Sequence, residues 1–231
     1  RVLFRSSPRR HKVLIGKDTR ISGYMLETAM ASGICSMGVD VLLVGPMPTP
    51  GIAFLTRSLR ADAGVVISAS HNPFQDNGIK FFARGGFKLA DDIEDAIEHR
   101  LNEPWQRPIG EEVGRVHSSA HLVEDYIAHL LSTVDVWLEG LKVVVDGANG
   151  AAAQIAPETY RRAGADVVEI NCAPDGWNIN HNCGSTHMEQ LRAAVVEHGA
   201  DLGIAHDGDA DRFLAVDANG EIVDGDQIIA I

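Results

Sequence analysis

One pattern occurs twice in the chain, and it constrains the fold more than any other feature of the sequence. Ala61-Asp-Ala-Gly64 opens an apolar stretch in the first half, and Ala200-Asp-Leu-Gly203 opens another in the second half. Eight residues after the aspartate of the first copy lies Ser70, and eight residues after that of the second lies Asp209. Because similar repeats fold into similar units, the pattern predicts two tandem units whose third strands end in functional loops at equivalent places.

Each unit alternates short β-branched runs with stretches of helical periodicity, as parallel strands joined by helices require. Strands are expected at residues 13–15, 39–44, 65–67, 79–82, 142–145, 164–168 and 213–216, and another is expected to open at 200–203. Helices are expected at residues 24–37, 51–60, 91–101 and 118–134, and another is expected to end at 162. In the first helix an apolar stripe that includes Met25, Met30 and Met37 is expected to face the core. The predicted fold class is α/β, with two tandem three-layer domains and mostly parallel, mixed sheets.

The domain boundary is placed beside residues 103–117, whose proline and glycine content is typical of a linker. The first domain is expected to cover residues 13–117 and the second residues 118–224. Residues 1–12 are basic and lack an initiating methionine. They are set aside as a segment that could be foreign to the natural chain.

The strand at 65–67 gives way to small and polar residues, so it presents a hydroxyl at an exposed tip. Ser70 on this tip is a candidate nucleophile, and its neighbour His71 is a candidate proton carrier. Lys80, which follows on the next apolar run, is a candidate partner for a phosphate or a leaving group. A Ser-His pair alone is weak evidence, because most such pairs lie in solvated turns.

A second loop supplies three carboxylates at alternate positions. Asp207, Asp209 and Asp211 can converge around a cation if the backbone curls. Like charges at this spacing repel one another, and a hard oxygen-binding cation relieves the repulsion. Mg²⁺ bound there would keep positions open for phosphate oxygen or water. The alternative is an acidic surface turn before the strand at 213–216.

Arginines accompany both loops. Arg212 directly follows the acidic loop and can grip a phosphate through two parallel hydrogen bonds. Arg20 lies in the first polar loop and could do the same from the opposite wall, with a surface salt bridge as the alternative. Ligands of open α/β sheets gather beyond the carboxyl ends of strands, so two such edges facing each other would form a cleft. Phosphoryl transfer through a phosphoserine needs a hydroxyl, a cation site, guanidinium groups and proton partners, and the two loops offer all four.

The composition excludes several classes of function. With 20 basic and 32 acidic side chains the formal charge is −12, which disfavours binding to nucleic acid and to anionic lipid. Apolar runs stay well short of the ~20 residues that a membrane span needs. Cys35, Cys172 and Cys183 lack C-x-x-C spacing, so buried packing in a reducing cytoplasm is expected.

Several long motifs, taken in order, resemble the α-D-phosphohexomutase superfamily and, within it, the bacterial phosphoglucosamine mutase family. The motifs are Gly16-Lys-Asp-Thr-Arg-Ile-Ser-Gly-Tyr-Met-Leu-Glu27, Gly45-Pro-Met-Pro-Thr-Pro50, Ser68-Ala-Ser-His-Asn-Pro73, Val145-Asp-Gly-Ala-Asn-Gly150, the acidic loop, and Asp224-Gly-Asp-Gln227. The resemblance covers nearly everything from Val13 onward. It implies interconversion of glucosamine 6-phosphate and glucosamine 1-phosphate, on the way to UDP-N-acetylglucosamine for the cell wall.

The resemblance also implies a role for each site residue. Ser70 would be the phosphoserine, and it would bind Mg²⁺ together with Asp207, Asp209 and Asp211. His71 and Lys80 would be acid/base or phosphate-positioning groups, and Arg20 and Arg212 would bind the transferring phosphate. The implied ligands are a small hexosamine phosphate and, as activator, glucosamine 1,6-bisphosphate or glucose 1,6-bisphosphate. The implied location is cytoplasmic, without nucleic acid or membrane partners, and a homodimer is allowed.

Three departures from the family pattern stand out. Ala210 occupies a position where the family usually has glycine, which is tolerable only if φ there is below zero. The Gly-Thr-Asp-Gly motif expected before the first strand is absent from the basic start. Family members have four domains, and residues 225–231 would only begin the third. This polypeptide alone is therefore expected to be inactive or nearly so in mutase turnover, since it holds the phosphoryl-transfer half of the site without the substrate-orienting half.

Three rival interpretations remain open. The specificity could be that of a phosphomannomutase or a phosphoglucomutase, which share the serine and metal loops. The chain could instead be a non-catalytic metal-binding module whose serine is never phosphorylated. A hydrolase with an aspartate nucleophile in the acidic loop is disfavoured, because it leaves the loop of Ser70 without a purpose.

Overall fold

Strands and helices alternate along the chain, as the hydrophobic pattern predicts. The computed structural model describes residues 10–230. The elements of the first half are β1 (Lys12–Lys17), α1 (Ser22–Cys35), β2 (Asp40–Pro46), α2 (Thr49–Ser58), β3 (Ala63–Ile67), β4 (Ile79–Ala83), α3 (Asp91–His99), two short 3-10 helices η1 (Arg100–Asn102) and η2 (Gly110–Glu112), β5 (Val116–Ser118) and α4 (Leu122–Ser132). Those of the second half are β6 (Lys142–Asp146), α5 (Ile155–Arg162), β7 (Asp166–Ile170), η3 (Gly184–Thr186), α6 (Glu189–His198), β8 (Leu202–His206), β9 (Phe213–Asp217), β10 (Ile222–Val223) and α7 (Gly225–Ala230).

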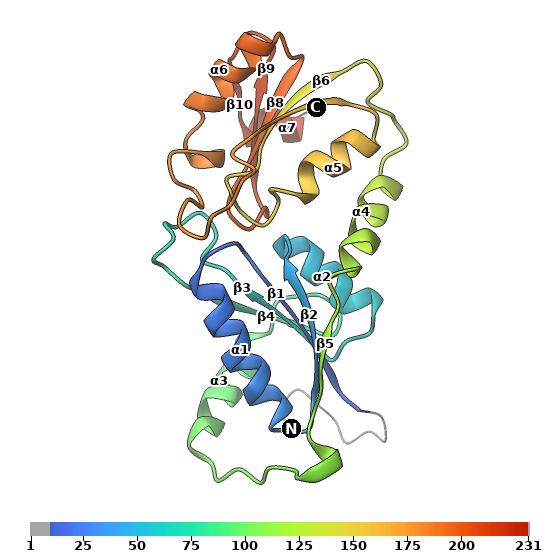
Figure 1. Ribbon diagram of the computed structural model, residues 1–231, viewed down its shortest axis with the longest axis vertical. Coiled ribbons are helices and arrows are strands. Elements are labelled where there is room, and N and C mark those ends of the chain that lie inside the picture. Colours follow the sequence, from blue (N-terminus) through green and yellow to red (C-terminus); the bar gives the residue numbers. More distant parts are fainter. Residues whose placement is uncertain (1–9, 231) are drawn as a thin grey trace.

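The strands form two five-stranded sheets, one from each half of the chain. Their orders are β4-β3-β1-β2-β5 and β10-β9-β8-β6-β7. The first three strands of each half pair in parallel, whereas β4, β9 and β10 pair antiparallel to their neighbours. The two sheets belong to two domains that lie end to end along the long axis of the molecule (Figure 1). The prediction of two tandem α/β domains with mixed sheets is confirmed.

The two sheets are built in the same way, as the sequence repeat predicts. The order β4-β3-β1-β2 matches β9-β8-β6-β7 strand by strand. At the start of β1 the amide of Lys12 donates to Asp62 Oδ2 at 3.0 Å, and at the start of β6 the amide of Lys142 donates to Asp201 Oδ2 at 2.7 Å. The aspartate that opens each repeat therefore anchors the neighbouring central strand of its own sheet.

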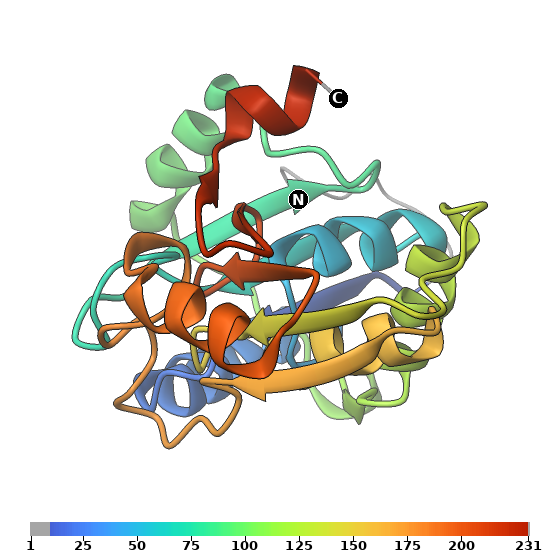
Figure 2. The same ribbon diagram turned by 90° about the horizontal axis from the view of Figure 1, so that it is seen from above.

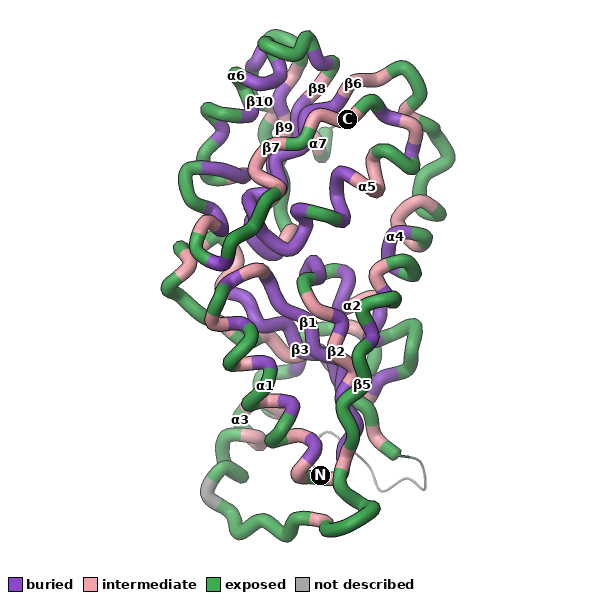
Figure 3. The backbone as a smooth tube through the Cα atoms, in the orientation of Figure 1, coloured by how far each residue is buried: buried purple, intermediate pink, exposed green. Residues whose placement is uncertain are grey.

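Helices cover both faces of each sheet. In the first domain α1 packs on one face and α2 on the other, and in the second domain α6 and α5 divide the faces in the same manner (Figure 2). The buried backbone follows the central strands of both sheets (Figure 3). Helix α4 contacts both α2 and α5, so it continues the first core toward the second domain (Figure 1).

The segment around residues 116–122 differs from the sequence-based expectation, and helix α6 was not predicted. Residues 116–118, assigned to the linker and to the start of a helix, form β5 and pair with β2, and the helix begins only at Leu122. The pairing arises because β2 offers a free edge that the returning chain can fill. Among residues 10–230, every helix is too short or too polar to cross a membrane.

The expected orientation of α1 is wrong in part. Its buried line consists of Gly23, Glu27, Ala31 and Cys35, whereas Met25 is 67% exposed and Met37 is 37% exposed. Met30 is half-buried at the edge of the core. The inner face is shifted because the carboxylate of Glu27 is buried against Lys17, with 2.6 Å between Oε2 and Nζ.

Candidate functional site

The loops that follow β3 and β8 meet at the boundary between the two domains. The side chain of Ser70, from the first loop, donates a hydrogen bond to Asp207 Oδ2 in the second at 2.7 Å. Both loops leave the carboxyl ends of parallel strands, which is where α/β sheets gather their ligands. The structure thus brings together the two loops that the repeat places at equivalent positions.

Three carboxylates converge in the loop between β8 and β9. One oxygen of Asp207, one of Asp209 and one of Asp211 all lie within 4.8 Å of one another. Asp207 and Asp209 are buried and Asp211 is exposed. Oxygen ligands gathered at this distance fit a hard divalent cation.

Backbone conformation makes this convergence possible, and it corrects one expectation. Ala210 has φ of 52°, so the expectation that this position needs φ below zero is wrong. The left-handed conformation costs a residue with a Cβ about 1–2 kcal/mol. It is imposed by the curl of the loop, in which the amide of Ala210 donates to the carbonyl oxygen of Asp207 at 3.0 Å.

The carboxylate of Asp209 receives two hydrogen bonds from the first domain. Lys80 Nζ and Thr49 Oγ1 both lie 2.6 Å from Asp209 Oδ2. Burial raises the pKa of this carboxyl, but the two donors and the charge of Lys80 outweigh burial and hold the pKa below its ordinary value. Burial conversely lowers the pKa of Lys80, and the bond to Asp209 more than offsets it, so that pKa is raised. The carboxylate and the ammonium are therefore both charged at neutral pH.

The second oxygen of Asp209 is the strongest sign of a cation site. Asp209 Oδ1 is fully buried and has no hydrogen-bond partner among the described residues. A buried carboxylate oxygen without a partner is costly, and a bound cation would satisfy it. The residues present therefore fit a divalent cation.

Arg212 links the two loops on the exposed side of the site. Its Nη2 lies 2.9 Å from Ser70 Oγ, 3.1 Å from Asp207 Oδ2 and 2.5 Å from His71 Nδ1. The guanidinium is thus directed at the serine hydroxyl, where the oxygens of a phosphate on Ser70 would lie. Arg212, Lys80 and His71 are the predicted residues that surround Ser70 and the carboxylates.

Arg20 lies beneath the serine loop instead of on an open wall. The residue is 1% exposed, its Nη1 pairs with Asp18, and its Nη2 donates to the carbonyl oxygens of Ser70 at 3.2 Å and Asn72 at 2.5 Å. The structure therefore does not bring the guanidinium of Arg20 to the side of the serine hydroxyl. The alternative of a surface salt bridge is wrong, because the pair with Asp18 is buried. Phosphate binding by Arg20 stays a prediction.

Two residues of the site carry no sequence-based prediction. Thr49 begins α2 and binds Asp209 through both its hydroxyl and its amide, the latter at 2.9 Å from the Asp209 carbonyl oxygen. Asn180 donates from Nδ2 to the carbonyl oxygens of Ser70 at 2.9 Å and Asn72 at 3.0 Å. Thr49 lies in the motif Gly45–Pro50, which gave it no individual role, and no local pattern marks Asn180. Both residues act across the domain boundary.

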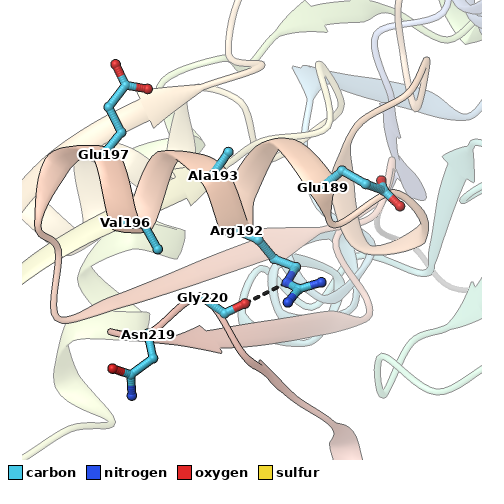
Figure 4. A pocket seen from close by; sticks show the side chains of 7 residues that line it. All are labelled: Glu189, Arg192, Ala193, Val196, Glu197, Asn219 and Gly220. Carbon is cyan, nitrogen blue, oxygen red and sulfur yellow. Dashed lines mark hydrogen bonds between the residues drawn. The ribbon is translucent and has the colours of Figure 1, made fainter.

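Two hollows lie outside the cluster of carboxylates. One, of ≈ 530 Å³, borders the serine loop and is lined by His71 and by residues of the segment 175–187. The other, of ≈ 540 Å³, lies on the outer side of α6 beside the β9–β10 turn, where Arg192 donates to the carbonyl oxygen of Gly220 (Figure 4). None of the predicted site residues lines the second hollow.

Two domain families match most of the chain. Residues 2–107 match domain I of phosphoglucomutase/phosphomannomutase, an alpha/beta/alpha domain, and residues 124–220 match domain II. The first match includes most of the basic segment at residues 1–12. Residues 1–9, where the Gly-Thr-Asp-Gly motif was sought, lie outside the described residues.

Curated phosphoglucosamine mutases are similar to this chain. The chain is 61% identical over 227 residues to a phosphoglucosamine mutase of Streptomyces griseus, covering 96% of this chain and 50% of the relative. It is 60% identical over 218 residues to that of Acidothermus cellulolyticus, covering 94% and 47%. The chain therefore spans about half the length of the curated relatives it matches.

Solved structures show the same arrangement of two domains. A phosphoglucomutase/phosphomannomutase family protein of Burkholderia thailandensis has a TM-score of 0.79 at 30% identity, with 92% of this chain and 48% of that chain covered. A putative phosphomannomutase of Thermus thermophilus has a TM-score of 0.81 at 26% identity, with 95% and 51% covered.

Proposed function

Because the chain belongs to the phosphoglucomutase/phosphomannomutase family, we propose that it carries the phosphoryl-transfer residues of a phosphoglucosamine mutase. The reaction would interconvert glucosamine 6-phosphate and glucosamine 1-phosphate. The observation that supports this most is the contact of Ser70 Oγ with Asp207 and Arg212, which joins a nucleophile to an acidic cluster across two domains. The name shared by the curated relatives supports this sugar over mannose or glucose.

The proposed reaction keeps the phosphate count constant. The phosphorus–oxygen bond of phosphorylated Ser70 breaks, and the phosphoryl group passes to the free hydroxyl of the hexosamine monophosphate. This forms a 1,6-bisphosphate and leaves a free serine hydroxyl. After the bisphosphate turns around, its other phosphoryl group returns to Ser70 and the isomeric monophosphate is released.

The side chains around Ser70 have distinct parts in this scheme. Arg212 binds the oxygens of the transferring group, since its Nη2 already lies against Ser70 Oγ. His71 and Lys80 are the candidates for moving the proton of the substrate hydroxyl or for positioning the phosphate. Because Arg20 lies under the loop, we propose that its contribution passes through the backbone of Ser70.

Asp207, Asp209 and Asp211 would hold the divalent cation, together with an oxygen on Ser70. Mg²⁺ is the proposed ion, because an all-oxygen site with positions left for phosphate and water suits it. When bound it supplies positive charge that neutralises the oxygens of the transferring phosphoryl group. The unpartnered Oδ1 of Asp209 is the oxygen that this role would satisfy.

Intact-mass measurement tests the proposal. The chain is incubated with Mg²⁺ and either glucosamine 1,6-bisphosphate or glucose 1,6-bisphosphate, and it should gain one phosphoryl group that peptide mapping places on Ser70. Ser70→Ala should gain none. A chain that binds the cation but never gains phosphate would be the non-catalytic metal-binding module, and the proposal would fail. Cytoplasmic location and homodimer formation remain predictions of the sequence.

A further inference from the structure

The loop that carries Ser70 is held in a backbone conformation that residues with a side chain rarely adopt. Ser70 has φ of 52°, in the left-handed region. The conformation of this loop is set in part by the amide of Ser70, which donates to Ser68 Oγ at 3.0 Å. Such a conformation persists only where the surrounding contacts fix it.

Two side chains, one from each domain, hold the carbonyl oxygens of this loop. Arg20 Nη2 donates to Ser70 O and Asn72 O from the same domain that carries the loop. Asn180 Nδ2 donates to the same two oxygens at 2.9 and 3.0 Å, and it comes from the second domain, which also carries the carboxylates. Of these two side chains, only Asn180 connects the loop directly to the second domain, which carries Asp207 and Arg212.

Asn180 is itself firmly placed. It is 8% exposed, has φ of 58°, and its amide donates to the carbonyl oxygen of Ala148 at 2.9 Å. Gly208 closes the remaining space, because a Cβ there would lie 2.7 Å from Asn180 Nδ2 and 2.5 Å from the carbonyl oxygen of Ser70. The side chain of Asn180 thus has little freedom to move away from the serine loop.

We propose that Asn180 is a positioning residue for Ser70. From the second domain it fixes the left-handed turn at Ser70, so that the serine oxygen stays directed at Asp207 and Arg212. Loss of the two donated hydrogen bonds would remove no reacting group, but it would loosen the loop that presents the hydroxyl. The catalytic part of this inference rests on the proposed function, whereas the part that concerns the loop does not.

Two variants and a matched control test the proposal. Asn180→Asp keeps the size of the side chain but turns an acceptor toward the two carbonyl oxygens. Asn180→Gly removes the donor and still tolerates positive φ, so it provides a second variant that the backbone can accept. Asn182 is the control, because it lies in the same segment with φ of 53° and is exposed, with its amide beside His181. Asn182→Asp therefore repeats the chemical change away from the serine loop.

Hydrogen–deuterium exchange of the peptide that covers residues 68–78 is measured without ligand, and phosphate gain at Ser70 is timed with Mg²⁺ and glucose 1,6-bisphosphate. Both Asn180 variants should exchange faster in this peptide and gain phosphate at least about tenfold more slowly. Asn182→Asp should match the wild type in both. Unchanged exchange would overturn the proposal, and so would faster exchange with an unchanged rate of phosphate gain. If the wild type gains no phosphate, the proposed function fails, and exchange alone then decides whether Asn180 holds the loop.

Discussion

Replacing Gly208 with alanine should push the serine loop away from the acidic loop. An added Cβ would lie 2.5 Å from the carbonyl oxygen of Ser70, whereas ordinary contact begins at 3.4 Å, so the loop must retreat by about 0.9 Å. Such a movement would lengthen the 2.7 Å bond between Ser70 Oγ and Asp207 Oδ2 to at most about 3.6 Å, which is beyond hydrogen-bond range. Overpacking of this kind costs about 1–3 kcal/mol. For a chain of this size that lowers the unfolding midpoint by about 2–12 °C.

The assay compares the unfolding midpoint with the rate of phosphate gain at Ser70. A displacement of about 1 Å can reduce the rate of a positioned reaction about 100-fold, so Gly208→Ala should be slowed far more than its loss of stability explains. Gly33→Ala is the control, since a Cβ at Gly33 in α1 meets no atom within 4 Å. That variant should be neutral or more stable by about 0.5–1 kcal/mol. A Gly208→Ala chain with the wild-type midpoint and rate would refute the reasoning.

Three further predictions concern the charges and the packing. Lys80→Met should lower the free energy of unfolding by about 1–2 kcal/mol, because buried Asp209 loses a charged donor. Mg²⁺ added in a denaturant titration should restore most of this loss, and an absence of any Mg²⁺ effect would contradict the account. Burial raises the pKa of Tyr160 to about 12 from an ordinary 10.0. Above pH 10.0 the phenol ionises in the unfolded chain but stays neutral in the folded protein, so the free energy of unfolding falls as the pH rises from 10.0 toward 12. The loss is on the order of 2 kcal/mol, and Tyr160→Phe should lack this part of the alkaline pH dependence in urea unfolding. Gly203→Ala should destabilise the folded protein by about 1–3 kcal/mol, because its Cβ would lie 2.6 Å from Val195 Cγ2. An unfolding midpoint equal to that of the wild type in a thermal scan would show that β8 packs less closely against α6.

The sequence repeat predicted the fold because it is a property of whole strands. Ser70 and Asp209 occupy equivalent positions, because each follows a strand that pairs in parallel with the first strand of its half. Alternate spacing indicated that the three aspartates can converge if the backbone curls, and in the structure one oxygen of each lies within 4.8 Å of the others. The position of each loop is set by neighbours in the chain or in one sheet, which periodicity records.

Contacts across the domain boundary and buried polar partners could not be predicted in this way. Arg20 has the residue type of a phosphate clamp, but its burial with Asp18 places it beneath the loop. Glu27 shifted the inner face of α1, because an ion pair with Lys17 makes a charged residue compatible with the core. Asn180 has no local signature at all, since its function depends on the docking of a loop 110 residues away.

The backbone at Ala210 carries a separate lesson. The expectation of negative φ considered only the conformational preference of alanine itself, whereas the curl of the loop determines the backbone conformation at this position. A residue with a Cβ is accepted in the left-handed region when the surrounding contacts fix the turn. Ser70 shows the same behaviour in the facing loop, so the two functional loops share this strained conformation.

The claim that one oxygen of Ser70 and three aspartates form a single cation site can be measured directly. Crystals of the chain are soaked in Mn²⁺ as a substitute for Mg²⁺, and the ion is located by its anomalous scattering. The account predicts one peak within about 2.0–2.5 Å of oxygens from Asp207, Asp209 and Asp211, and equally close to an oxygen on Ser70. A peak elsewhere, or one that binds the aspartates while Ser70 lies out of reach, would contradict it.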